Sequence, residues 1–132
     1  MFTLCKDERL RGKRAIANLF DAGRTFFQAP YKVFWIKTPE IGLHPVCFAV
    51  AVPKRRFKRA VMRNLLKRRT REAFRINKQI LSNAITDNRQ VHVMVVYVSD
   101  KLLTYADLEE AMKKILQRIA KQNEQQKNVE SV

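Results

Sequence analysis

The spacing of hydrophobic residues along the chain predicts three helices. Apolar residues at helical intervals predict a first helix over Lys13–Ala22, with Gly23 where a helix-terminating glycine belongs. A long helical pattern begins near Arg59 and continues past Ile80. A final helix is expected after Thr104, a predicted N-cap with Asp107 three residues later. Its core stripe is expected to contain Leu108, Ala111, Met112, Ile115, Leu116 and Ile119.

Three segments rich in β-branched and aromatic residues predict strands over residues 31–38, 46–52 and 91–99. The second is apolar almost throughout, so both of its faces are expected to be covered. The order helix, strand, strand, long helix, strand, helix predicts an α+β fold, a two-layer α/β sandwich with helices packed on a sheet. We expect one domain over residues 1–132, with a polar tail that frays from about residue 122. If the second and third strands are parallel neighbours, the general rule predicts a right-handed crossover.

Composition and charge narrow the function classes. The chain has 132 residues, 27 Lys or Arg against 12 Asp or Glu, a net charge of +15, and 46% hydrophobic residues. This favours a folded domain with a polyanionic partner. No apolar run is long enough to span a membrane, and the first residues do not resemble a secretory signal. The two cysteines, Cys5 and Cys47, are expected to be reduced in a cytoplasmic protein, with a disulfide between them as the open alternative.

The positive charge is concentrated in one segment. Residues 54–75 contain eleven Lys or Arg residues and a single acid, Glu72. On a helical projection, a core stripe is expected from Met62, Leu65, Leu66, Ala73, Ile76 and Ile80. The opposite side is expected to carry Arg63, Asn64, Lys67, Arg71, Arg75 and Lys78, with Phe74 beside this basic face and Arg68 flanking it. Arg69 falls within the apolar stripe and must either extend to the helix end of the core or find a buried partner.

Like charges four residues apart on a helix cost about 0.2–0.5 kcal/mol per pair, so an external anion is the best explanation of the basic face. The alternatives are a solvated basic face and a membrane-surface helix, but the apolar side of the helix is needed by the core. A second basic cluster lies near the N-terminus, and aromatic residues interleave with Arg24 and Lys32, as in grooves that bind single-stranded nucleic acid. No paired carboxylates, phosphate loop, nucleophile–base pair or metal cluster is evident, which disfavours protein-based catalysis.

The segment from Arg59 to Phe74 resembles the signature helix of the protein subunit of bacterial ribonuclease P. The family pattern is roughly A-V-x-R-N-x-x-K-R-x-x-R-E, and residues 60–72 match each fixed position. Arg9, Leu10, Phe20 and Gly23 also resemble the opening helix of the family, so the likeness extends from about Arg9 to Ile119. The resemblance implies a roughly four-stranded sheet with three helices, like a ribosomal protein domain, and a left-handed β-α-β crossover.

The resemblance also implies a function. The family protein joins a catalytic RNA that removes the 5′ leader of precursor tRNA, using magnesium bound mainly by the RNA. We therefore expect a cytoplasmic, monomeric protein in a 1:1 complex with the RNA subunit, with precursor tRNA as the second partner and no protein catalytic residues. The expected RNA-binding residues are Lys54, Arg55, Arg56, Arg59, Arg63, Asn64, Lys67, Arg68, Arg71 and Arg75. The expected leader cleft lies between the first helix, the sheet and the signature helix, and its residues are Ile16, Phe20 and Phe34.

Two departures from the family pattern concern the expected site. Ile16 replaces an aromatic residue of the family cleft, which removes a ring for base stacking at that point. A glycine before the signature helix is replaced within Arg56–Arg59, in a turn one residue longer and more basic than usual. The alternative functions are a ribosomal or other structural RNA-binding protein and, with less support, a free-standing nuclease.

Overall fold

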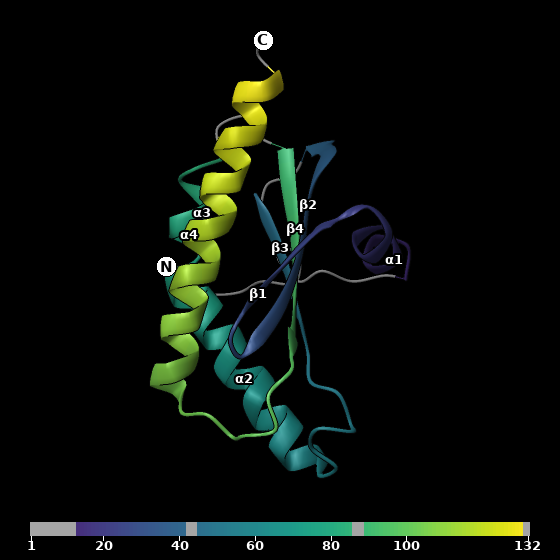
Figure 1. Ribbon diagram of the computed structural model, residues 1–132, viewed down its shortest axis with the longest axis vertical. Coiled ribbons are helices and arrows are strands. Elements are labelled where there is room, and N and C mark those ends of the chain that lie inside the picture. Colours follow the sequence, from purple (N-terminus) through teal and green to yellow (C-terminus); the bar gives the residue numbers. More distant parts are fainter. Residues whose placement is uncertain (1–12, 42–44, 86–88, 131–132) are drawn as a thin grey trace.

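The computed structural model of the protein describes residues 13–41, 45–85 and 89–130 (Figure 1). The elements follow in the order α1 (Lys13–Ala22), β1 (Arg24–Gln28), β2 (Tyr31–Ile41), β3 (Val46–Ala51), α2 (Ala60–Asn77), α3 (Gln79–Ser82), β4 (Arg89–Tyr97) and α4 (Tyr105–Glu130). The α+β class, the four-stranded sheet and the position of the first helix are confirmed. Two short elements, β1 and α3, were not predicted as separate units. The predicted long helix is divided at Lys78: α2 ends at Asn77 and α3 begins at Gln79.

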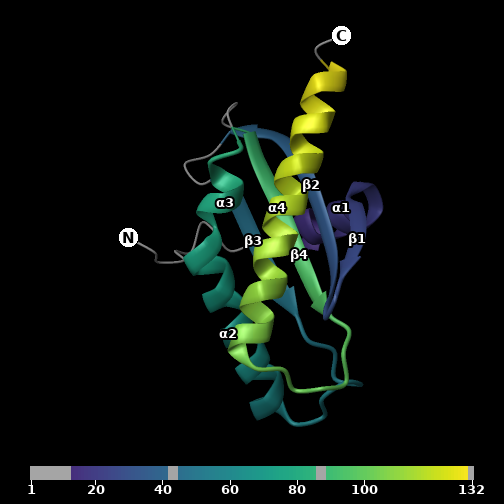
Figure 2. The ribbon, with the colours of Figure 1, turned by 60° about the vertical axis from the view of Figure 1, so that its left-hand side comes forward.

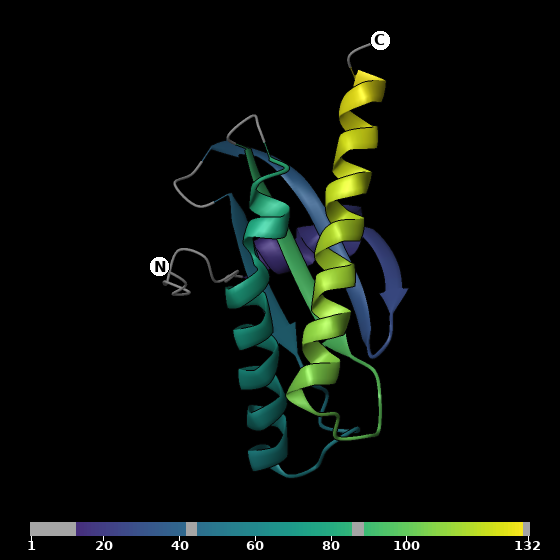
Figure 3. The same ribbon diagram turned by 90° about the vertical axis from the view of Figure 1, so that its left-hand side faces the viewer.

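The sheet is mixed, with strand order β1-β2-β4-β3. The β1–β2 and β2–β4 pairs are antiparallel, whereas β3 and β4 pair in parallel. The connection from β3 to β4 passes through α2 and α3. Figure 3 views the sheet from the side of these helices: β3 and β4 run downward and β4 lies to the right of β3, so the crossover is left-handed. The default right-handed expectation is therefore wrong here, and the left-handed crossover implied by the family resemblance is confirmed.

Helices cover the two faces of the sheet unequally. The long helices α2 and α4 pack side by side on one face, and α3 continues alongside α4 (Figure 2). The single helix α1 lies on the opposite face (Figure 1). Strand alternation divides the core accordingly. Val33, Trp35 and Phe48 belong to the large cluster with α2 and α4, while Phe34, Cys47 and Met94 pack with Leu19 of α1.

The core-facing side of α2 matches the predicted stripe only in part: Leu66 and Ala73 are buried as predicted, but the buried side is turned from the predicted one. The buried residues of this helix are Leu66, Thr70, Ala73 and Phe74. Phe74, which was expected beside the basic face, is fully buried and stacks on Phe48 with ring centroids 4.2 Å apart and planes 7° from parallel. Ile76, which was expected in the core, is 40% exposed. The helix is turned toward Thr70 because the Thr70 hydroxyl is satisfied by the buried Tyr31 hydroxyl at 2.6 Å.

The C-terminal helix α4 follows its predicted pattern closely. All six residues of its expected core stripe are buried. Its N-terminus is capped as predicted, because the Asp107 amide donates to Thr104 Oγ1 at 3.3 Å and the Thr104 hydroxyl donates to Asp107 at 3.1 Å. The helix itself continues to Glu130, and the fraying expected from about residue 122 stays a prediction. Gln122 accepts a hydrogen bond from the Trp35 indole at 2.8 Å, and Asn123 is buried, so this part of the helix is anchored to the fold.

The buried Tyr31 predicts a loss of stability in alkali. Burial raises the pKa of its hydroxyl well above the ordinary value, and the hydrogen bond to Thr70 only partly opposes this. Below about pH 10, Tyr31 is neutral in both the folded and the unfolded chain, and its contribution to stability is constant. Above that pH the unfolded chain ionises first, so the free energy of unfolding should fall by about 1.4 kcal/mol per pH unit from this group. Denaturant titrations at several alkaline pH values should show a smaller slope for Tyr31→Phe, and equal slopes would contradict the assignment.

Candidate nucleic-acid interface

The predicted RNA-binding residues lie on the turn after β3 and along α2. Six of the ten are exposed to solvent: Lys54, Arg55, Arg59, Asn64, Arg68 and Arg71. The start of α2 adds to the positive potential there. Arg59 occupies the N-cap position without a side-chain cap, and no acid lies in the first turn. Because the amino end of a helix carries partial positive charge, this end of α2 is suited to bind an anion such as a phosphate.

The other four predicted residues are half-buried: Arg56, Arg63, Lys67 and Arg75. All except Lys67 make contacts within the protein that fix the turn or the helix. The Arg56 guanidinium forms an ion pair with Asp100 at 2.9 Å. Arg63 donates to the carbonyl oxygens of Phe57 and Lys58, both at 2.8 Å. The expectation that Arg63 lies opposite the core is therefore wrong: its side chain folds back and secures the turn before α2. Lys67 is likewise half-buried rather than fully on the outer face, because α2 is turned toward Thr70.

Arg75 is paired with the single acid of the segment. Its Nε donates to Glu72 at 3.0 Å, and a second hydrogen bond joins Arg75 Nη2 to the other carboxylate oxygen. The hydrogen bond from Arg75 lowers the pKa of the Glu72 carboxyl and raises the pKa of the Arg75 guanidinium. This pair offsets part of the repulsion among cations on the helix, so Arg75 contributes less net positive charge than the exposed residues.

Arg69, which falls within the predicted apolar stripe, has a hydrogen-bond partner in the structure. Its guanidinium donates to the Leu103 carbonyl oxygen at 2.8 Å, in the loop between β4 and α4. Together with the Arg56–Asp100 ion pair, this contact ties α2 and its preceding turn to that loop. The sequence gives no local signal for either contact, because the partners lie 34 and 44 positions apart.

The two cations Arg63 and Lys67 should therefore behave differently when removed. Arg63→Ala should lower the free energy of unfolding by about 1–2 kcal/mol, because two charge-assisted hydrogen bonds to carbonyl groups are lost. Lys67→Ala is the matched control and should change stability by about 0.5 kcal/mol or less. Urea denaturation followed by circular dichroism measures both. Equal stability of the two variants would show that Arg63 does not secure the turn.

The three predicted cleft residues come together on the α1 side of the sheet. Phe20 is 45% exposed and meets Phe34 edge-to-face with ring centroids 4.7 Å apart. Ile16 packs against the cluster that contains Phe34 and Leu19. The Lys32 ammonium lies 5.4 Å from the centroid of the Phe34 ring. These residues thus form an aromatic surface with a cation beside it. The expectation that the signature helix also borders this cleft is wrong, because α2 packs on the other face of the sheet (Figure 1).

Three residues named in the sequence analysis, Cys5, Arg9 and Leu10, lie outside the described residues. His92 is buried in β4, and Cys47 is buried in β3. The described residues contain no group of three or more His, Cys, Asp or Glu side chains that could hold a metal ion. None of the helices in that part of the chain has both the length and the apolar composition needed to cross a bilayer.

The sequence profile of the family described as Ribonuclease P matches residues 4–120. The chain belongs to this family. It is 39% identical over 121 residues to the ribonuclease P protein component of two Porphyromonas gingivalis strains, covering 90% of this chain and 88% of each relative. Ribonuclease P membership makes the chain a protein component of a ribonuclease complex, and tRNA processing and a ribonucleoprotein context fit the family.

Solved ribonuclease P proteins share the fold. The Staphylococcus aureus protein superposes with a TM-score of 0.69 at 22% identity, covering 86% of this chain and 95% of that one. The Thermotoga maritima protein superposes with a TM-score of 0.65, also at 22% identity, covering 84% and 96%. At 22% identity, this likeness shows the fold alone. The side-chain contacts described above come from the structure of this chain.

Proposed function

We propose that the chain binds the catalytic RNA subunit of ribonuclease P through the turn after β3 and the outer face of α2. The observation that carries this proposal is that some cations are paired within the protein while others are exposed on its surface. Arg56, Arg63 and Arg75 are held by contacts within the protein, and they fix the turn and the helix. Lys54, Arg55, Arg59 and Arg68 remain on the surface. Exposed cations on a turn and helix that are fixed in this way can displace counterions from an RNA backbone and position it.

The aromatic surface on the other face supports a second role in binding the 5′ leader of precursor tRNA. Single-stranded nucleic acid is commonly held by bases stacked on aromatic rings beside cations. Phe20 offers an exposed ring, and Phe34 packs edge-to-face against it. Lys32 supplies the positive charge. Because this surface and α2 lie on opposite faces of the sheet, the protein can contact the RNA subunit and the leader at the same time.

The chemistry in this proposal belongs to the RNA subunit. The described part of the chain offers no carboxylate cluster for magnesium, so we assign the metal mainly to the RNA and route no step through the protein. The protein assists endonucleolytic removal of the leader by lowering the dissociation of precursor tRNA. We further propose a cytoplasmic 1:1 complex of one protein monomer with one RNA subunit.

Reconstitution with the cognate RNA subunit tests the proposal. At low magnesium, the complex should cleave precursor tRNA faster than the RNA alone. It should also bind precursor tRNA more tightly than mature tRNA, since only the precursor carries the leader. Equal affinity for the two tRNAs would overturn the leader role and favour a purely structural RNA-binding protein. Cleavage by the protein without RNA would overturn the assignment of the chemistry to the RNA.

Phe20→Ala should selectively weaken the binding of precursor tRNA to the reconstituted complex. Loss of one base–aromatic contact should cost about 1–3 kcal/mol, which corresponds to a Kd roughly 5- to 150-fold higher. The Kd for mature tRNA should not change, because the leader is absent. Leu102→Ala is a suitable control, since Leu102 is 41% exposed in the loop before α4, outside both α2 and the aromatic surface. Filter binding with both tRNAs measures the effect, and a parallel loss for both would contradict a leader contact.

A further inference from the structure

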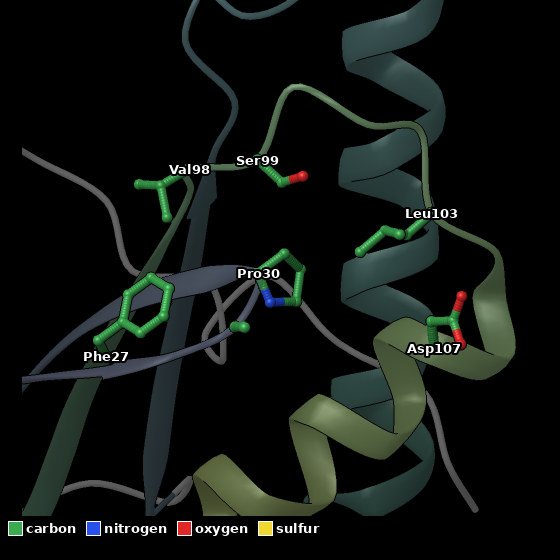
Figure 4. A pocket seen from close by; sticks show the side chains of 7 residues that line it. Phe27, Pro30, Val98, Ser99, Leu103 and Asp107 are labelled. Atoms are coloured by element: carbon green, nitrogen blue, oxygen red, sulfur yellow. The ribbon is translucent and has the colours of Figure 1, made fainter.

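A cavity of about 610 Å³ lies at the end of the sheet where the β1–β2 turn, the end of β4 and the start of α4 meet. Its size is within the range of small-molecule sites. Figure 4 shows Phe27 and Val98 on one side, Leu103 and Asp107 on the other, and Pro30 between them. Ala29 and Ser99 complete the lining. The walls are mainly apolar, with one hydroxyl and one carboxylate, which fits a flat heteroaromatic ring with polar edges.

Phe27 gives this cavity an exposed aromatic wall. Its ring is 60% exposed, more than that of any other phenylalanine in the described part of the chain. The strand beneath it is well fixed. Arg118 of α4 stacks on the neighbouring Phe26 ring at 4.3 Å and donates to the Phe27 carbonyl oxygen at 3.4 Å. Phe27 is thus a solvent-facing ring on a rigid support, the arrangement that base stacking requires.

The cavity is continuous with the proposed leader surface. Phe27 pairs directly with Lys32 across β1 and β2, and residues paired in this way project to the same face. Lys32 in turn lies over Phe34, which contacts Phe20. The aromatic surface therefore extends from α1 across β2 to Phe27 and ends at the cavity. None of the four residues that form this surface is acidic: Phe20, Phe34, Lys32 and Phe27.

The opposite wall of the cavity adjoins the basic turn before α2. Leu103 accepts the hydrogen bond from Arg69, and Asp100, next to Ser99 in sequence, holds Arg56. The cavity therefore lies between the two surfaces proposed to contact RNA. This position favours an RNA ligand over an apolar peptide, for which the surrounding cations provide no partner.

The polar groups in the cavity indicate which part of a nucleotide would enter it. Asp107 places a carboxylate there, oriented by the Thr104 hydroxyl, and it would repel a phosphate. Ser99 Oγ accepts a hydrogen bond from the Lys101 amide, and its hydroxyl also pairs with Tyr97, so Asp107 is the main polar group that the cavity offers to a base. Carboxylates accept hydrogen bonds from the exocyclic amino groups of bases. Adenine, cytosine and guanine carry such a group, and uracil does not.

We propose that this cavity binds one unpaired, amino-bearing base of single-stranded RNA, stacked on Phe27 with its polar edge toward Asp107 and Ser99. The inference rests on the proposed leader-binding function and extends it beyond Ile16, Phe20 and Phe34. It assigns Phe27 as a stacking residue and Asp107 as the residue that selects the base.

The test uses the full chain and short single-stranded RNA carrying one 2-aminopurine at successive positions. One position should show fluorescence quenching on binding, because the base stacks on a ring. Phe27→Ala should abolish that quenching and raise the Kd about tenfold, while Phe27→Tyr should restore both. Leu102→Ala is the matched control, since Leu102 is 41% exposed in the adjacent loop but does not line the cavity. Unchanged quenching in Phe27→Ala would overturn the proposal.

Base selection provides a second readout. Cytidine at the quenched position should bind more tightly than uridine, and Asp107→Asn should remove this preference. No preference in the unaltered chain would overturn the assigned orientation of the base. In the complex with the catalytic RNA, weaker precursor binding by Phe20→Ala but not by Phe27→Ala would refute the cavity and leave the leader role intact. If neither variant changes precursor binding, the leader role itself fails.

Discussion

Binding of the chain to the catalytic RNA subunit should weaken by about 10³- to 10⁵-fold between roughly 50 and 200 mM monovalent salt. This is the loss expected for a protein that neutralises about 6–10 phosphates and releases their counterions. The exposed cations of the turn and α2 can make such contacts, and they lie on a chain whose net charge is +15. Filter binding or fluorescence titration across the salt series measures the slope. A Kd that is flat over this range would contradict a phosphate-docking role.

Single substitutions should separate the docking cations from the structural ones. Arg68→Gln removes an exposed cation and should lower the slope of log K against log salt by about one. Arg75→Gln is the matched control on the same helix, because Arg75 is already paired with Glu72. Its slope should change less than that of Arg68→Gln. The opposite order would show that the ion pair opens on binding and that Arg75 is the docking residue.

Phe74→Ala should destabilise the fold by about 3–5 kcal/mol, the cost of emptying a buried phenylalanine site. The Phe74 ring is fully buried and stacked on Phe48 of β3, so its removal leaves a cavity between α2 and the sheet. A loss of this size is a large fraction of the stability of a typical domain. Urea or thermal denaturation measures it, and Phe74→Leu should recover much of the loss by refilling the site.

Ile76→Ala is the control that tests the orientation of α2. Ile76 is 40% exposed, so its truncation should cost about 1 kcal/mol or less. The helical projection of the sequence alone gives the opposite ranking, with Ile76 in the core and Phe74 beside the basic face. A greater loss for Ile76→Ala than for Phe74→Ala would therefore support the sequence-derived stripe over the structure.

The failure of that projection has a physical cause. A projection assigns the core side of a helix from the distribution of apolar residues and treats every polar residue as outward-facing. Thr70 breaks this rule because Tyr31, 39 positions away, supplies a buried hydrogen-bond partner. Arg69 can then turn to the Leu103 carbonyl group at the edge of the core. Helices whose contacts are mostly apolar are not subject to this error, and α4 follows its predicted stripe at all six positions.

The sequence by itself determined the three long helices, three of the four strands, the concentration of charge and the ribonuclease P family. These properties are local: helical periodicity, strand composition and a signature within 13 consecutive residues are all read along the chain. The tertiary structure decided which cations of that segment are exposed and which are held by Asp100, Glu72 or carbonyl groups. It also decided that Phe27, Ser99 and Asp107 line one cavity. Burial and pairing depend on partners brought together from distant segments, and only folding creates those contacts.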